Sequence, residues 1–115
     1  MSKEITRLEA GTRMSPAVIC GDMVYLAGQV GDGPDVTAQA LSALAEVDRL
    51  LALSGTSKSR ILTTTVYLAN MGDYAAMNAV WDAWIDPANP PARATCEARL
   101  ATPDYVVEFV VTAVR

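Results

Sequence analysis

Two charged residues of opposite sign, Arg93 and Glu108, interrupt stretches of sequence that are otherwise apolar. Arg93 follows P-P-A, and Glu108 lies fifteen positions later within V-V-E-F-V-V. A charge inside an apolar strand is costly unless it is paired or functional. The two residues are either structural, as an ion pair between facing strands or as part of a solvent-facing edge, or they form a site in which the arginine binds a carboxylate beside a water-handling glutamate. The second role suits arginine, because its two parallel N–H groups match a planar carboxylate.

Several residues near these charges are weaker candidates for lining a pocket. Cys96 shares the predicted strand of Arg93, although a free cysteine is more often a small apolar core residue. Gly28 follows a short apolar run, where it can simply permit a bulge or a close approach. Trp81 and Trp84 lie on one helical stripe and are typical of core or subunit contacts. The candidate substrate-binding residues are Arg93, Ala27, Gly28, Cys96 and Trp84.

The composition removes several classes of function. The chain has no histidine, which excludes Ser-His-Asp and Cys-His catalytic sets and any metal site that needs an imidazole. Nine basic against thirteen acidic residues give a net charge of −4, unlike the basic surface that nucleic acids require. The two cysteines form no CxxC motif, the first residues are polar, and no apolar stretch would span a membrane. We therefore expect a cytoplasmic protein without metal, cofactor, nucleic-acid or membrane partner.

The hydrophobic patterning predicts one α+β domain over residues 1–115. Residues with β-branched and aromatic side chains predict strands at 18–20, 23–30, 61–68, 92–100 and 106–114. Three- and four-residue spacing predicts one helix that Asp35 caps and that ends before Gly55. Asn70 begins a second helix that runs to about Ile85. We expect the first two strands to pair, and the last two to form an antiparallel pair.

This set of elements leaves one face of the sheet without a cover. Two helices can cover only one face of a mixed sheet. In the last strand, apolar residues alternate with Val106, Val110 and Thr112, so both faces of this strand are rich in apolar or threonine side chains. A large exposed apolar face normally marks an interface. We therefore expect the chain to form an obligate homo-oligomer.

Several segments taken in order closely resemble the Rid family, also called YjgF or L-PSP, across nearly the whole chain. They are VYLAGQV at 24–30, the helix beginning near Gln39, ILTTTVYLAN at 61–70, YAAMNAVWDAW at 74–84, PAR at 91–93, and Val107-Glu108. No single segment is specific, but the ordered set is. The resemblance implies a chorismate-mutase-like subunit in a homotrimer with a central barrel and ligand clefts between neighbouring subunits.

The resemblance also implies a reaction and roles for two residues. Family members that hydrolyse reactive enamines and imines, such as 2-aminoacrylate or 2-iminopropionate, hold the substrate carboxylate with the arginine of the PAR motif, which corresponds to Arg93. The glutamate that positions or activates water corresponds to Glu108. The chain departs from better-characterised deaminases at Ala27, where serine is frequent, at 14–17, where a G-P-Y segment is usual, and at Thr95, where cysteine is frequent.

Two other functions stay open at this point. A non-catalytic trimer that senses a small carboxylate would use the same arginine, so the sequence does not separate it from a deaminase. A ribonuclease or translation inhibitor, which the family's names suggest, is disfavoured by the acidic composition, the absence of histidine and the lack of a basic-aromatic run.

Overall fold

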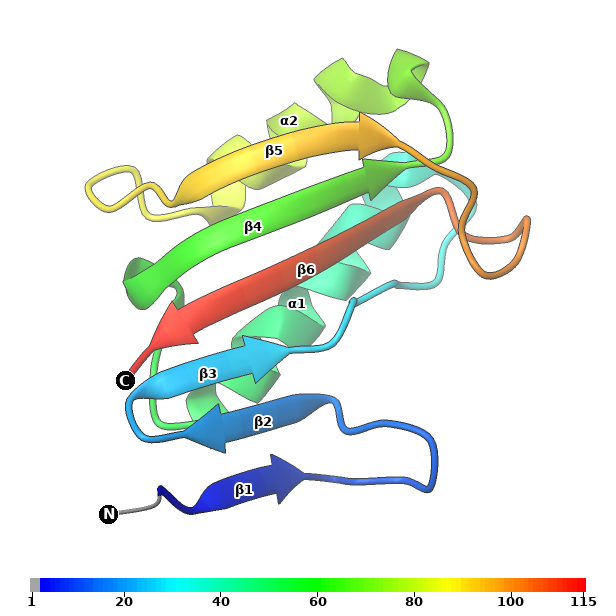
Figure 1. The fold of residues 1–115 in the computed structure, drawn as a ribbon. Helices are drawn as coiled ribbons and strands as arrows, with labels where there is room; N and C mark the ends of the chain where they lie inside the picture. Colours follow the sequence, from blue (N-terminus) through cyan, green and yellow to red (C-terminus); the bar gives the residue numbers. More distant parts are fainter. Residues whose placement is uncertain (1–2) are drawn as a thin grey trace.

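The computed structural model describes residues 3–115, which form one six-stranded sheet and two α-helices (Figure 1). The strands stand in the order β1-β2-β3-β6-β4-β5. Their bounds are β1 Ile5–Leu8, β2 Ala17–Cys20, β3 Met23–Leu26, β4 Ile61–Leu68, β5 Ala92–Glu97 and β6 Val107–Val114, and the helices are α1 Val36–Leu53 and α2 Tyr74–Trp84. The mixed sheet with two helices agrees with the expected fold class.

The pairing expected for the last two strands is wrong. Strand β4 lies between β5 and β6, pairing parallel with β5 and antiparallel with β6. The reason is α2, which follows β4 and returns the chain so that β5 enters beside β4 in the same direction. Parallel neighbours need such a crossover, usually a helix. The expected pairing of β2 with β3 is confirmed.

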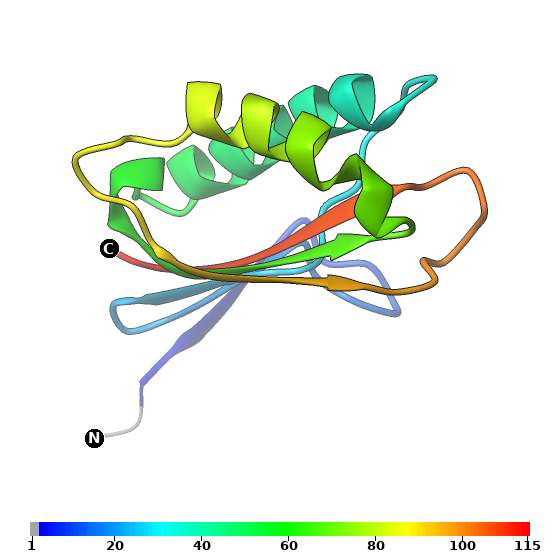
Figure 2. The same ribbon diagram turned by 90° about the horizontal axis from the view of Figure 1, so that it is seen from above.

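Both helices cover the same face of the sheet, as expected (Figure 2). The Asp35 carboxylate accepts a hydrogen bond from the Ala38 N–H and caps α1, and Gly55 adopts a φ of +80° just beyond its end. The Asn70 side chain accepts from the Gly72 N–H and caps the short 3-10 turn that precedes α2. The core between the layers is apolar, and its largest fully buried side chains include Phe109, Leu44, Leu50, Leu51 and Leu68.

Two other elements differ from the sequence prediction. Strand β1 was not predicted, because its four residues, I-T-R-L, are too few to show an alternating pattern, and they are mostly exposed. Strand β3 ends at Leu26 instead of reaching Val30, and Gln29 returns to the sheet through an isolated bridge to Phe109. The chain between these two points therefore leaves the regular ladder, which places Ala27 and Gly28 in an irregular segment beside β6.

No other element among residues 3–115 covers the face of the sheet away from the helices, which we call the open face. The pairing register places Tyr25, Thr65, Tyr67, Glu108, Val110 and Thr112 on it. Tyr25 is 47% exposed, which is high for a large aromatic side chain on a sheet. No helix among residues 3–115 is long and apolar enough to cross a membrane.

Candidate functional site

Arg93 lies near the start of the edge strand β5, on the face of the sheet that the helices cover. Its register partner on β4 is Thr64, which is fully buried against the helices, and register partners share a face. The side chain is half-buried and extends across α2. Because β5 has only one neighbouring strand, its other side is open to solvent, and Arg93 lies beside that opening.

Aromatic and sulfur groups of α2 surround the Arg93 guanidinium. The guanidinium carbon lies 5.2 Å from the centroid of the Trp81 ring and 5.9 Å from that of Tyr74, within the range of cation–π attraction. Nη2 donates to the Tyr74 hydroxyl at 3.4 Å, and Nη1 approaches the Met77 Sδ at 3.9 Å. Among residues 3–115 no carboxylate forms an ion pair with Arg93. The guanidinium is thus oriented by weak contacts and keeps its capacity to bind an anion.

The same contacts affect the phenol of Tyr74. A hydrogen bond with Asn78 and, second, the positive charge of Arg93 hold the pKa of Tyr74 below its ordinary value of 10.0. Two threonines on the same face as Arg93, its register partner Thr64 and Thr95, have buried hydroxyls without a partner within the described part of the chain. Thr95 follows Arg93 by two positions on β5 and therefore shares its face of the sheet.

Glu108 lies on the opposite side of the sheet, on the open face. Its register partner on β4 is Tyr67, whose partner on β5 is Cys96. These three residues form a row across the open face. A hollow of about 370 Å³ lies beside them, with Tyr67, Glu108 and Arg99 among the residues that line it.

Gly28 lets the Glu108 carboxylate lie directly against the backbone of residue 28. A Cβ at residue 28 would stand 2.6 Å from the Glu108 Oε2, closer than real Cβ contacts. The approach arises because Gln29 and Phe109 exchange two backbone hydrogen bonds of 2.8 and 2.9 Å, which draw the segment after β3 against β6. Gly28 and Glu108 are therefore neighbours, as a shared site requires.

The two charges that the sequence singled out do not meet within one protomer. Arg93 is aligned with Thr64 and Glu108 with Tyr67, and residues separated by an odd number of positions on β4 point to opposite faces. The expectation that two facing strands bring the charges together fails, because β4 separates their strands and the register directs them to different faces. A structural ion pair between them within one chain is likewise absent from residues 3–115.

The other candidate residues are Cys96, Ala27 and Trp84, and they differ in how they lie relative to Arg93 and Glu108. Cys96 is exposed and belongs to the row that contains Glu108. Ala27 is half-buried, and its N–H donates to the Pro16 carbonyl at 2.9 Å. The Trp84 Nε1 donates to Asp48 of α1 at 2.8 Å, so this tryptophan connects the two helices and contributes to neither charged group.

The sequence interpretation did not assign Tyr74, Met77, Tyr67 or Arg99 to a site. Tyr74, Met77 and Trp81 recur at three- and four-residue spacing, so the helical stripe was visible in the sequence, but the strand that it faces was not. Tyr67 and Glu108 could be matched only from the register of β4 with β6.

Comparisons with known proteins agree along nearly the whole chain. A family model described as endoribonuclease L-PSP matches residues 4–115. A RutC family protein from Haemophilus ducreyi is 50% identical over 111 residues, which cover 95% of each chain. A 2-iminobutanoate/2-iminopropanoate deaminase from Salmonella typhimurium is 32% identical over 100% of this chain and 99% of its own. The crystal structure of a YjgF-family protein from Neisseria meningitidis gives a TM-score of 0.96 at 42% identity, covering 97% of this chain and 95% of that chain.

Proposed function

Because the chain belongs to the Rid family, also called YjgF or L-PSP, we propose that it hydrolyses small 2-imino acids and their enamine tautomers to 2-keto acids and ammonia. The observation that carries this proposal is the half-buried Arg93 guanidinium, which is oriented by α2 and has no acidic partner among the described residues. Such a group favours a small carboxylate as its ligand. A relative of 32% identity bears the name of a 2-imino acid deaminase, which supports the reaction class.

We place the reaction in a cleft between two copies of the chain. Arg93 borders the free edge of the sheet, whereas Glu108 lies on the open face. A neighbouring copy whose open face meets the β5 edge would bring its own Glu108 toward Arg93. The open face carries exposed apolar side chains such as Ile5 and Tyr25, which association would remove from water. The arrangement we propose is a homotrimer with a central barrel.

The chemistry then needs only water and proton transfers. The Arg93 fork holds the substrate carboxylate, and an enamine gains a proton at carbon and loses one at nitrogen to become the imine. Water adds to the imine carbon while Glu108 accepts a proton from it and returns it to the nitrogen. The hydroxyl group of the resulting carbinolamine loses a proton and its nitrogen gains one, the carbon–nitrogen bond breaks, and ammonia and a 2-keto acid leave. Positioned acid–base groups contribute about 10² to 10⁴-fold to such a step, and orientation adds to this.

The test is release of 2-keto acid from freshly generated 2-iminopropionate. We expect Glu108→Gln to lower chiefly kcat, because the substrate carboxylate is still held, and Arg93→Ala to raise KM as well. Arg49→Ala is the matched control for loss of an arginine, since Arg49 binds Glu9 and Glu46 at the outer side of α1. Rates that are equal for wild type, Arg93→Ala and buffer would refute the deaminase. Retained binding of 2-ketobutyrate without turnover would instead favour a protein that senses carboxylates.

The compartment and partners follow the same reasoning. Cys20 and Cys96 are both free thiols, which suits the reducing cytoplasm that we propose. The acidic charge balance disfavours nucleic acid, so the partners we propose are the small imine or enamine and further copies of the chain.

A further inference from the structure

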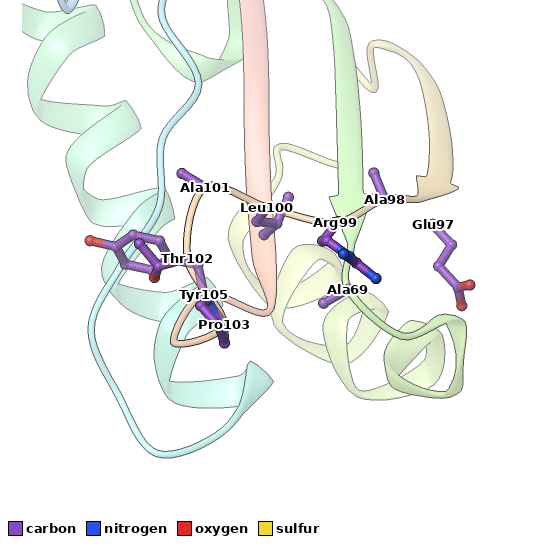
Figure 3. A pocket seen from close by; sticks show the side chains of 9 residues that line it. All are labelled: Ala69, Glu97, Ala98, Arg99, Leu100, Ala101, Thr102, Pro103 and Tyr105. Atoms are coloured by element: carbon purple, nitrogen blue, oxygen red, sulfur yellow. The ribbon is translucent and has the colours of Figure 1, made fainter.

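A pocket of about 680 Å³ lies beyond the carboxyl ends of β4 and β5 (Figure 3). Ala69, which follows β4, and Glu97, which ends β5, form one side of it, and the loop that leads to β6 forms the rest. Its volume is in the range of small-molecule sites. Neither Arg93 nor Glu108 lines it, although Arg99, Leu100 and Ala101 also line the hollow beside Glu108, so the pocket adjoins the Glu108 side of the proposed cleft and is separate from Arg93.

Hydrogen bonds hold the pocket's loop in place. The Gln39 side chain of α1 is 97% buried, with 3% of its surface exposed; its Nε2 donates to the Asp104 carbonyl at 2.8 Å and its Oε1 accepts from the Val106 N–H at 2.9 Å. Within the loop, the Tyr105 N–H donates to the Thr102 carbonyl at 3.2 Å. A wall fixed in this way needs little ordering when a ligand binds.

Two opposite charges lie at one end of this pocket without pairing with each other. The Glu97 Oε2 accepts a hydrogen bond of 2.9 Å from the Met71 N–H, which fixes the carboxylate and leaves its other oxygen available. Arg99 is exposed and makes no side-chain hydrogen bond or ion pair to residues 3–115. Figure 3 shows both side chains at the end beside β5, with the Tyr105 ring at the opposite end.

The surface between these ends carries the apolar side chains of Leu100, Ala101 and Pro103 together with Thr102. Leu100 and Tyr105 are half-buried, and Ala101 and Pro103 complete the wall. A ligand that satisfies the whole pocket therefore carries an anion and a cation close together and an apolar body beyond them. We propose that this pocket binds a small α-amino acid with an apolar side chain, with its carboxylate on Arg99, its ammonium group on Glu97 and its side chain directed toward Tyr105.

The test is a titration of the full-length chain followed by the backbone amide signals of residues 98–105. The probes are L-phenylalanine, 3-phenylpropionate, which lacks the ammonium group, and 2-phenylethylamine, which lacks the carboxylate. Arg93→Ala is the parent protein, because it removes the guanidinium of the proposed cleft. We expect saturable shifts with L-phenylalanine and binding about tenfold weaker or more with each of the two truncated probes, since charge-assisted hydrogen bonds are lost.

Two variants separate the charges. Arg99→Gln should weaken L-phenylalanine and 3-phenylpropionate about tenfold. Glu97→Gln keeps an oxygen acceptor for the Met71 N–H. It should lower the affinity for L-phenylalanine to that for 3-phenylpropionate. The affinity for 3-phenylpropionate itself should stay unchanged or rise. An unchanged affinity of Arg99→Gln for L-phenylalanine, or equal affinities of the parent for L-phenylalanine and 3-phenylpropionate, would overturn the proposal. Binding seen in wild type but abolished in the Arg93→Ala parent would overturn it too, by assigning the ligand to the cleft.

Discussion

Two inactive variants are expected to restore each other's activity when they assemble together. The first is Arg93→Ala, which keeps Glu108, and the second is Glu108→Gln, which keeps Arg93. The register places these residues on opposite faces of one sheet, so the cleft that we propose would take its arginine from one chain and its glutamate from another. A mixed oligomer of the two variants therefore contains some clefts in which both native residues meet.

The size of the effect follows from counting chains. In a random one-to-one mixture, a cleft receives Arg93 in half of the cases and Glu108, independently, in half. About one quarter of the clefts are then native, whatever the number of subunits in a closed ring of identical interfaces. The unselected mixture should show about one quarter of the wild-type rate per chain. Purification through both tags removes oligomers of a single variant, so in a trimer about one cleft in three is then native and the rate should rise to about one third, whereas each variant alone stays near the rate of buffer.

The assay is 2-keto acid release by co-expressed, differently tagged variants that are purified through both tags in succession. The control mixes Arg93→Ala with a variant that carries both Arg93→Ala and Glu108→Gln. No chain in this mixture has Arg93, so no cleft is native and the mixture should stay inactive. A co-assembled sample that is no more active than its components would refute the shared cleft. It would mean that both residues act within one chain or that one of them has no part in the reaction.

Four further changes test the structure around these groups. Gln39→Leu removes three hydrogen bonds, and at about 1 kcal/mol each should lower the unfolding free energy measured in urea by about 3 kcal/mol. Thr64→Val removes a buried hydroxyl without a partner among residues 3–115 and should raise that free energy by about 1 kcal/mol; a destabilised variant would contradict this. Gly28→Ala should displace the Glu108 carboxylate, which lowers kcat while the urea midpoint changes little. Hydrogen bonds from Arg49 lower the pKa of its two glutamate partners below 4.5, so the Tm difference between wild type and Arg49→Ala should be present at pH 7 and vanish as acid protonates both partners.

The helix ends were predictable from the sequence because their signals are local. Asp35 and Gly55 bracket α1 within one residue of the observed ends, since a capping carboxylate and a left-handed glycine act on the turn in which they stand. Strand β4 was predicted with its observed bounds, because three threonines and their β-branched neighbours favour an extended chain at any place in the fold.

The order of the strands in the sheet depends on contacts between distant parts of the chain. Its prediction failed because two strand orders fit the same hydrophobic pattern. The runs that became β5 and β6 are consecutive and apolar, which suggested a hairpin. The signal that favours the observed order was the sequence of β4, α2 and β5, because a strand, a helix and a strand in succession normally form a parallel pair. The connection between β5 and β6 then passes the end of β4, and its ten residues or so create the pocket lined by Arg99.

Arg93 and Glu108 are separated by one strand, and they also lie on opposite faces of the sheet. Arg93 and Glu108 are connected through β4 at Thr64 and Tyr67, three positions apart. A one-residue shift of the β4–β6 ladder would bring Glu108 to the face of Arg93, but it would also turn the apolar set of β6, including Phe109 and Val111, away from the core. A one-residue shift of the β4–β5 ladder would instead remove Arg93 from its contacts with Tyr74 and Trp81 of α2. Core packing therefore keeps Glu108 on one face and contacts with α2 keep Arg93 on the other, which is why the proposed reaction is assigned to a cleft between two copies of the chain.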